Sequence, residues 1–420
     1  MMGITSSPSF TMKKALLSAL CLPDVLYVTD VQDADKNIIV SCKTKKRPVP
    51  CPHCKGKSSG YDTRMHKKLH TSLNGKKVFL HAALRRFQCK ECRKVFTETV
   101  EGMSGIKTTA HFDQLVQEKS RNQDFASVAR ELNINPKTVA KKQDLLSLEK
   151  FAVPDYDEVN LGLDGKYLNG EHEIFVMGDV KKKKFFGVTK DNSVANLKKT
   201  LKENLIEKGK KVVTVSIDMS KTLKGIKDSL FPEALLVIDK FHVFKYVNAV
   251  IDLCRIAVEK GNNERFSIKR LLLMKVKTME NIRFKPKWKK KVQRFERILA
   301  THPEIRILWD LKNRLHVFYE SANRKDAEEH FCGVIAFLDS YRKEHPEFAD
   351  LKKTLLNWKP YILNHFDTGI TNAFIEGLNN RIETLKRKRY GFRDTERFIR
   401  SIVFALLPIF FFIQSSIFTH

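Results

Sequence analysis

After Pro154 the chain carries a succession of short apolar segments whose order restricts the possible folds more than any other feature. The first three alternate apolar and polar residues and are joined by short polar turns, which predicts antiparallel strands. An amphipathic helix, a fourth strand, a short helix and a fifth strand follow, and a strand reached through a helix is expected to lie parallel to a neighbour. The expected strands are residues 159–163, 173–179, 184–189, 212–217 and 234–238, and the first helix is residues 193–207.

This order predicts an α/β fold with a ribonuclease H-like mixed sheet, in which the first and fourth strands are neighbours at the centre. Asp164 follows the first expected strand and Asp218 follows the fourth. Because adjacent strands lie about 4.8 Å apart, both carboxylates can reach one divalent cation. Asp239 follows the fifth strand, one strand further out, so we expect Asp239 and nearby His242 to have supporting roles.

A third acidic residue, Glu376, lies in a predicted helix near the C-terminus. Polar residues recur there at steps of three and four, with an apolar stripe on the opposite face. An ordinary amphipathic surface helix would show the same division, so the helix alone does not establish a site. Glu376 together with Asp164 and Asp218 predicts a three-carboxylate centre, with Asn372 and Asn380 as supporting residues.

The charge of the chain favours a polyanionic partner. Lys and Arg number 77 against 48 Asp and Glu, a formal net charge of +29, which attracts nucleic acid or an anionic membrane. The longest apolar segment, residues 402–413, contains Pro408 and is shorter than the roughly 20 residues of a membrane span. The N-terminus has no charged segment ahead of an apolar core, so we expect no secretory signal and no membrane partner.

Four of the eight cysteines form two Cys-x-x-Cys pairs, Cys51 with Cys54 and Cys89 with Cys92. Each pair can offer two thiolates to one tetrahedral Zn²⁺ ion, which predicts a four-cysteine zinc ribbon. The alternating residues 76–84 indicate a hairpin between the pairs. Four free buried thiols are the alternative interpretation. Nearby histidines could also replace a thiolate ligand; they are His53, His66, His70 and His81.

A helix-turn-helix is predicted over residues 125–143, with a turn at 133–135 and Asn135 capping the second helix ahead of Pro136. The polar face of that second helix could enter a DNA major groove, although a plain helical hairpin would have a similar pattern. A basic run follows the Glu376 helix. The predicted DNA-binding residues are Lys137, Thr138, Lys141, Lys142, Lys386, Arg387, Lys388, Arg389 and Arg393.

In this order the motifs resemble those of DDE transposases of the bacterial ISL-three insertion-sequence group, from about Leu20 to Phe398. The matching segments are residues 85–89, the helix-turn-helix, and residues 163–165, 216–220, 239–243 and 372–392. The resemblance implies a mostly helical insertion between the fifth strand and the Glu376 helix. The expected layout is 1–104 for N-terminal strands and zinc ribbon, 105–150 for the helix-turn-helix, 151–244 with 365–405 for the catalytic domain, 245–364 for the insertion, and 406–420 for an apolar tail.

The resemblance also implies a chemistry. Asp164, Asp218 and Glu376 would hold two Mg²⁺ (or Mn²⁺) ions about 4 Å apart and cleave DNA at the terminal inverted repeats of an insertion sequence. The freed 3′-hydroxyls would then attack target DNA, in a dimer or larger assembly in the bacterial cytoplasm, at the nucleoid. Two alternatives remain: a catalytically inactive DNA-binding regulator or accessory factor with the same domains, and an RNA-processing or structure-specific nuclease.

Overall fold

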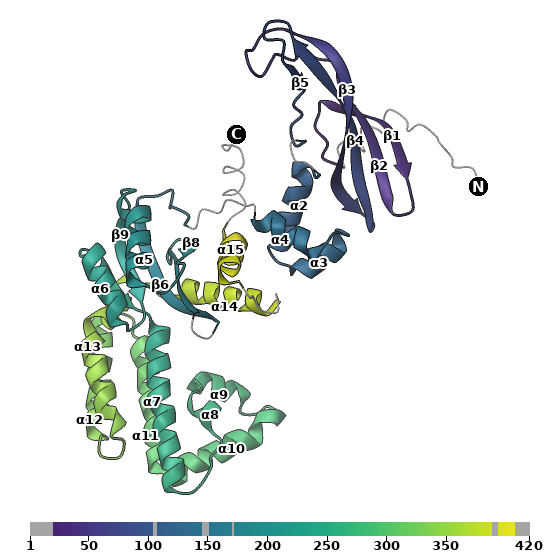
Figure 1. The fold of residues 1–420 in the computed structure, drawn as a ribbon. Coiled ribbons are helices and arrows are strands. Elements are labelled where there is room, and N and C mark those ends of the chain that lie inside the picture. Colours follow the sequence, from purple (N-terminus) through teal and green to yellow (C-terminus); the bar gives the residue numbers. More distant parts are fainter. Residues whose placement is uncertain (1–19, 104–106, 145–150, 170–171, 389–393, 408–420) are drawn as a thin grey trace. The chain divides into compact units, whose positions relative to one another are not determined.

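The computed structural model describes residues 20–103, 107–144, 151–169, 172–388 and 394–407 (Figure 1). The chain divides into two compact units. The first consists mainly of Met1–Leu148 and Thr384–Ala405, and the second mainly of Glu149–Glu383. The predicted apolar tail beyond residue 407, together with Arg389 and Arg393, lies outside the described residues.

A five-stranded sheet forms the larger part of the first unit, in the order β1-β2-β4-β3 with β5 paired to β4. Its longest strands, β3 and β4, form a hairpin that turns at Asn74 and Gly75, where φ is 49° and 77°; this Asn-Gly pair suits a tight hairpin turn. The hairpin predicted between the cysteine pairs is therefore present. The strands are β1 (Leu26–Asp33), β2 (Asn37–Thr44), β3 (Ser58–Leu73), β4 (Lys76–Cys89) and β5 (Val95–Thr97).

Three short helices, α2 (Ala110–Ser120), α3 (Phe125–Glu131) and α4 (Pro136–Asp144), share a small apolar core in the same unit. The predicted helix pair and turn are confirmed as α3 and α4. Asn133 takes a left-handed φ of 53° in the turn, and the Asn135 side chain accepts a hydrogen bond from the Lys137 backbone N–H at 2.8 Å. A further helix, α15 (Thr395–Leu406), reaches this group through Ser401, which donates to Gln143 Oε1 at 3.2 Å.

The second unit contains the predicted ribonuclease H-like sheet, in the order β10-β9-β6-β7-β8. The pairs β6–β7 and β7–β8 are antiparallel, and β6–β9 and β9–β10 are parallel, as expected. The elements are β6 (Glu158–Asn169), β7 (His172–Asp179), β8 (Lys184–Val188), α5 (Val194–Leu201), the π-helical turn η1 (Lys202–Ile206), β9 (Lys211–Ile217), α6 (Lys221–Leu230) and β10 (Leu235–Ile238).

One strand boundary was predicted wrongly. β6 does not end at Leu163 but continues to Asn169, because its pairing with β7 persists, with Gly165 opposite Phe175 and Tyr167 opposite Glu173. Asp164 therefore lies within a strand, whereas Asp218 directly follows β9 as expected.

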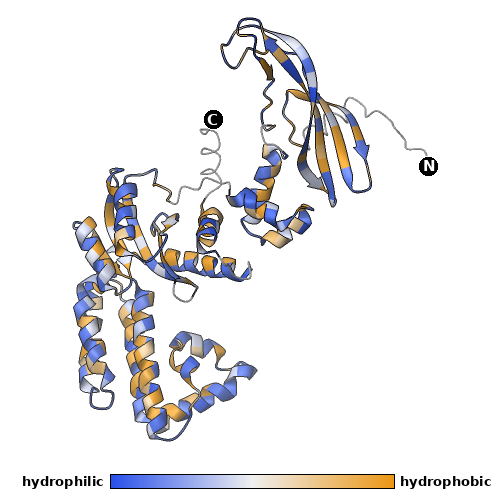
Figure 2. Cartoon of the chain, in the orientation of Figure 1, coloured by the Kyte–Doolittle hydropathy of each residue, from blue (hydrophilic) through white to orange (hydrophobic). Residues whose placement is uncertain are grey.

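Seven helices lie between β10 and α14, in the segment where the helical insertion is predicted. Their buried residues join those of the sheet in one core. Hydrophobic residues are concentrated along α7, for example (Figure 2). The helices are α7 (Lys240–Gly261), α8 (Lys269–Leu272), α9 (Val276–Ile282), α10 (Pro286–Thr301), α11 (Pro303–Tyr319), α12 (Arg324–Ser340) and α13 (Glu347–Thr368). In the part of the chain that the structure describes, no helix has the length and hydropathy of a membrane span.

The helix that carries Glu376, α14 (Ala373–Lys388), begins against the sheet at two glycines. A Cβ atom on Gly162 of β6 would lie 2.7 Å from Ile375 Cγ1, and one on Gly178 of β7 would lie 3.2 Å from a Phe374 ring carbon. Only glycine leaves this space, so the two strands allow the first turn of α14 to approach closely. That approach sets Glu376 beside the strands that carry the aspartates.

Candidate functional site

The predicted acidic residues gather where the central strands meet α14. Asp164 lies in β6, Asp218 follows β9, Asp239 follows β10, and Glu376 occupies the first turn of α14. Asp164 is close enough to Asp218 and Glu376 to interact electrostatically with both. The structure thus places both other predicted carboxylates within electrostatic range of Asp164. The predicted supporting residue His242 is also close, with its Nε2 3.8 Å from Asp164 Oδ1.

Burial and mutual repulsion raise the pKa values of two of these acids. Burial raises the pKa of Glu376 to about 7, and the negative charges of Asp239 and Asp164 add to that rise. Burial likewise raises the pKa of Asp164; the charge of Asp218 adds to it, while His242 opposes it. Like-charged carboxylates held together in a poorly solvated place are stabilised by a bound cation.

Two oxygen atoms of the cluster lack hydrogen-bond partners within the described part of the chain. Asp218 Oδ1 and Glu376 Oε1 are buried and have no hydrogen-bond partner among the described residues. Buried polar atoms are normally paired, and unpaired carboxylate oxygens are suited to binding a cation. Carboxylate oxygens are the ligands that Mg²⁺ and Mn²⁺ prefer. Asp164, Asp218 and Glu376 could therefore hold such an ion.

Asp239 has a different environment. Its Oδ2 accepts a hydrogen bond from the Phe241 backbone N–H at 3.0 Å and caps α7, and its Oδ1 accepts one from the Asn372 backbone N–H at 2.8 Å. The residue is only 1% exposed. Both oxygens thus help to position backbone, tying the start of α7 to the start of α14. Ligand atoms of Asp239, His242 and Glu376 nevertheless lie within 4.8 Å of one another.

An asparagine of the predicted polar stripe that was not among the predicted site residues contacts the site directly. Asn379 Nδ2 donates to Asp164 Oδ2 at 2.7 Å, whereas the predicted supporting residue Asn380 is exposed. Asn372, also predicted, is fully buried and its Nδ2 donates to the Leu163 carbonyl at 3.4 Å. Asn372, Glu376 and Asn379 are separated by four and three residues, which places them on one face of the helix. This spacing could have identified Asn379 as a site residue.

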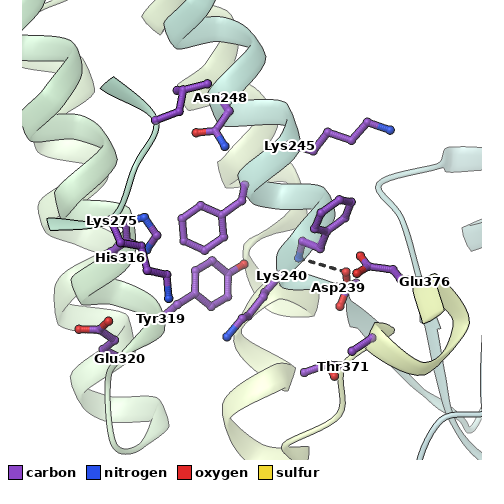
Figure 3. A pocket seen from close by; sticks show the side chains of 14 residues that line it. Asp239, Lys240, Lys245, Asn248, Lys275, His316, Tyr319, Glu320, Thr371 and Glu376 are labelled. Carbon is purple, nitrogen blue, oxygen red and sulfur yellow. Dashed lines mark hydrogen bonds between the residues drawn. The ribbon is translucent and has the colours of Figure 1, made fainter. Parts of the chain in front are cut away.

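A cavity of about 740 Å³ opens beside Glu376 and Asp239. Figure 3 shows these two acids on one side, with Lys275, His316 and Glu320 on the opposite wall. Lys240, Lys245, Phe241, Phe244 and Tyr319 line it as well. The sequence held no signal for this cavity, since its walls come from helices of the insertion and from α14.

The four paired cysteines converge as the motif predicts. Cys51 Sγ lies 3.6 Å from Cys92 Sγ, and Cys54 Sγ lies 3.4 Å from Cys89 Sγ. The backbone N–H of Cys92 donates to Cys89 Sγ at 3.5 Å, a contact that stabilises a thiolate at that position. This is a structural zinc site with four thiolate ligands.

The residues predicted to bind DNA differ from one another in exposure and in their contacts. Lys137 and Lys141 of α4 are exposed. Lys142 instead pairs with Asp113 Oδ1 at 2.8 Å and donates to Thr108 Oγ1 at 2.7 Å, so it holds α4 against its own unit. Thr138 is half-buried. Lys386, Arg387 and Lys388 form the last turn of α14.

These parts define a mixed α/β protein in which a zinc ribbon and a helix-turn-helix accompany a carboxylate centre on a ribonuclease H-like sheet. Residues 161–402 match the family model for ISL3 transposases, and residues 47–92 match that described as the zinc-finger of transposase IS204/IS1001/IS1096/IS1165. A curated relative, the transposase for insertion sequence element IS1001 from Bordetella parapertussis, is 22% identical over 388 residues, covering 88% of this chain and 92% of the relative. The chain belongs to the ISL3 family of transposases.

Proposed function

We propose that this protein binds the terminal inverted repeats of an insertion sequence and carries out metal-dependent cleavage and strand transfer of DNA. The observation that carries the proposal is the gathering of Asp164, Asp218 and Glu376, with buried carboxylate oxygens that lack partners. A net charge of +29 and membership in a transposase family support DNA as the substrate.

In this proposal Asp164, Asp218 and Glu376 hold the divalent cations. When bound, Mg²⁺ or Mn²⁺ supplies Lewis-acid activation of the attacked phosphate and of the nucleophile. Asn379 keeps the Asp164 carboxylate in place through its hydrogen bond. Asp239 fixes the turn that presents Glu376. Because the pKa of Glu376 is about 7, its carboxylate becomes available for cation binding as the pH rises through neutrality.

The reaction consists of two phosphoryl transfers. Water attacks the phosphorus at the element end, the bond to the 3′ oxygen breaks, and that oxygen takes up a proton to become a free 3′-hydroxyl. The hydroxyl oxygen then attacks a target phosphate, loses its proton and displaces the 3′ oxygen of the target strand. Two element ends must be joined, so we propose at least a dimer on DNA.

Separate surfaces would hold the DNA. Lys137 and Lys141 on the exposed face of α4 suit a major groove, and the basic last turn of α14 suits phosphate. The cavity beside Glu376 combines aromatic rings with lysines, a combination that suits unpaired nucleotides next to the cut phosphate.

The test is to incubate the purified protein with the terminal repeats of its own element, in Mg²⁺ or in EDTA, and to map the strand ends. We expect Mg²⁺-dependent 3′-hydroxyl ends, abolished by Asp164→Asn, Asp218→Asn or Glu376→Gln while gel-shift binding persists. Glu383→Gln on the same helix is the matched control and should cleave. Binding without any nicking by the wild-type protein would instead select the inactive regulator.

A further inference from the structure

A second group of metal-binding side chains lies within the helical insertion, apart from the carboxylate centre. Cys254 comes from the middle of α7, and His345 and Glu347 flank Pro346 where α13 begins. Ligand atoms of these three residues lie within 4.8 Å of one another. Segments about 90 residues apart in sequence thus bring a thiol, an imidazole and a carboxylate to one point.

The spacing suits a single tetrahedral ion. Zinc bonds to sulfur at about 2.3 Å and to nitrogen or oxygen at about 2.0–2.2 Å, which puts neighbouring ligand atoms on the order of 3.5 Å apart. Cys254 Sγ lies 3.4 Å from Glu347 Oε2. The zinc ribbon of the same chain has Sγ separations of 3.4 and 3.6 Å.

His345 makes a hydrogen bond of the kind that metal-binding histidines make. Its Nε2 lies 3.1 Å from the Glu304 carbonyl oxygen, and the structure gives its Nδ1 no hydrogen bond within the described residues. A histidine that binds metal through one ring nitrogen commonly donates the other N–H to a carbonyl, which fixes the tautomer.

The local charge favours a cation. Glu304, Glu344 and Glu347 all interact electrostatically with His345, an acidic neighbourhood in a chain of net charge +29. A thiol hydrogen-bonded to a carboxylate would account for the contact between Cys254 and Glu347. It would not account for a ring nitrogen of the buried His345 lying within 4.8 Å of both atoms.

We propose that Cys254, His345 and Glu347 bind one Zn²⁺ ion that links α7 to the start of α13. Sulfur, nitrogen and oxygen together favour zinc over Mg²⁺, which prefers oxygen alone. Binding releases the thiol proton of Cys254 and leaves a thiolate on the metal. Glu347 is only half-buried, so a water molecule can complete the tetrahedron from that side. The ion braces the insertion, whose α7 also begins at Asp239 beside the carboxylate centre.

Zinc content of the purified full-length protein tests this directly. After growth with added zinc and removal of loose metal by desalting, mass spectrometry should find two zinc ions per chain. Cys254→Ser and His345→Gln should each reduce the count to one. The double variant Cys89→Ser/Cys92→Ser, which removes the ribbon site, should also retain one. Cys332→Ser, an exposed cysteine of the same insertion, is the control and should retain two.

One zinc per wild-type chain, lost entirely in the ribbon double variant, would overturn the proposal. If Cys254→Ser does not fold, Glu347→Gln changes a more exposed ligand and should lower the count in the same way. Cobalt gives a second measurement. The ribbon double variant loaded with Co²⁺ should show the visible absorption bands of a tetrahedral site with a thiolate ligand. The absence of these bands would overturn the proposal. Neither measurement involves DNA, so both are independent of the proposed transposition chemistry.

Discussion

Neutralising Glu376 should make the metal-free protein more stable, although it removes a residue that we propose to be catalytic. In the absence of a cation Glu376 is crowded by burial and by the charges of Asp239 and Asp164. Glu376→Gln removes the charge while keeping the size of the side chain.

The size of the expected stability gain follows from the change in the pKa of Glu376 on folding. A pKa that rises from 4.5 to about 7 means that the folded state keeps its proton when the unfolded state has lost it. Stability therefore falls as the pH increases from 4.5 to about 7, and the full penalty is present above that. At about 1.4 kcal/mol per pH unit the limit is roughly 3 kcal/mol, which solvent screening at this partly exposed side chain reduces to about 1–2 kcal/mol.

The assay is thermal unfolding in EDTA at pH 8 and at pH 4.5. Glu376→Gln should unfold roughly 2–6 °C above wild type at pH 8, and at the same temperature at pH 4.5. The control Glu383→Gln, on the same helix as Glu376, loses an ion pair with Lys166 of β6 and should be unchanged or slightly less stable at pH 8. Mg²⁺ should stabilise wild type at pH 8 but not Glu376→Gln. A variant no more stable than wild type at pH 8 would refute the account of a crowded carboxylate.

Three further substitutions separate the roles of individual residues. Asn379→Ala removes a hydrogen bond to a charged group, worth about 1.5–3 kcal/mol, so end cleavage should fall by roughly 10- to 100-fold with unchanged gel-shift affinity; equal loss in Asn380→Ala would contradict this role. Lys141→Ala should lower the slope of log binding constant against log salt by about 1, whereas Lys142→Ala should lower stability instead. Phe241→Ala should reduce cleavage roughly 5- to 100-fold through lost stacking, and Phe284→Ala, also exposed but outside the cavity, should not.

The parts of the fold that could be predicted depend on local patterns. Alternating strands, a helix between strands and an aspartate after an apolar run are all visible within a few residues, so the sheet order and the meeting of Asp164 with Asp218 followed from topology. The two Cys-x-x-Cys pairs likewise specify their ligands through spacing alone.

The features that could not be predicted depend on contacts with residues distant in the sequence, or on which face of a helix a side chain occupies. β6 runs past Leu163 because β7 continues to pair with it. Asn379 faces Asp164 and Asn380 does not, since one residue turns a helix by about 100°. Lys142 is held by Asp113 of another helix. The group of Cys254, His345 and Glu347 has no characteristic spacing, because these residues come from segments far apart in the chain.

Crystals soaked in Mn²⁺ and measured for anomalous scattering test the central claim most directly. The account predicts peaks within bonding distance of Asp164, Asp218 and Glu376, and their loss when Asp218 is replaced by Asn. Manganese bound only between Asp239, His242 and Glu376, with Asp164 and Asp218 uncoordinated, would contradict it.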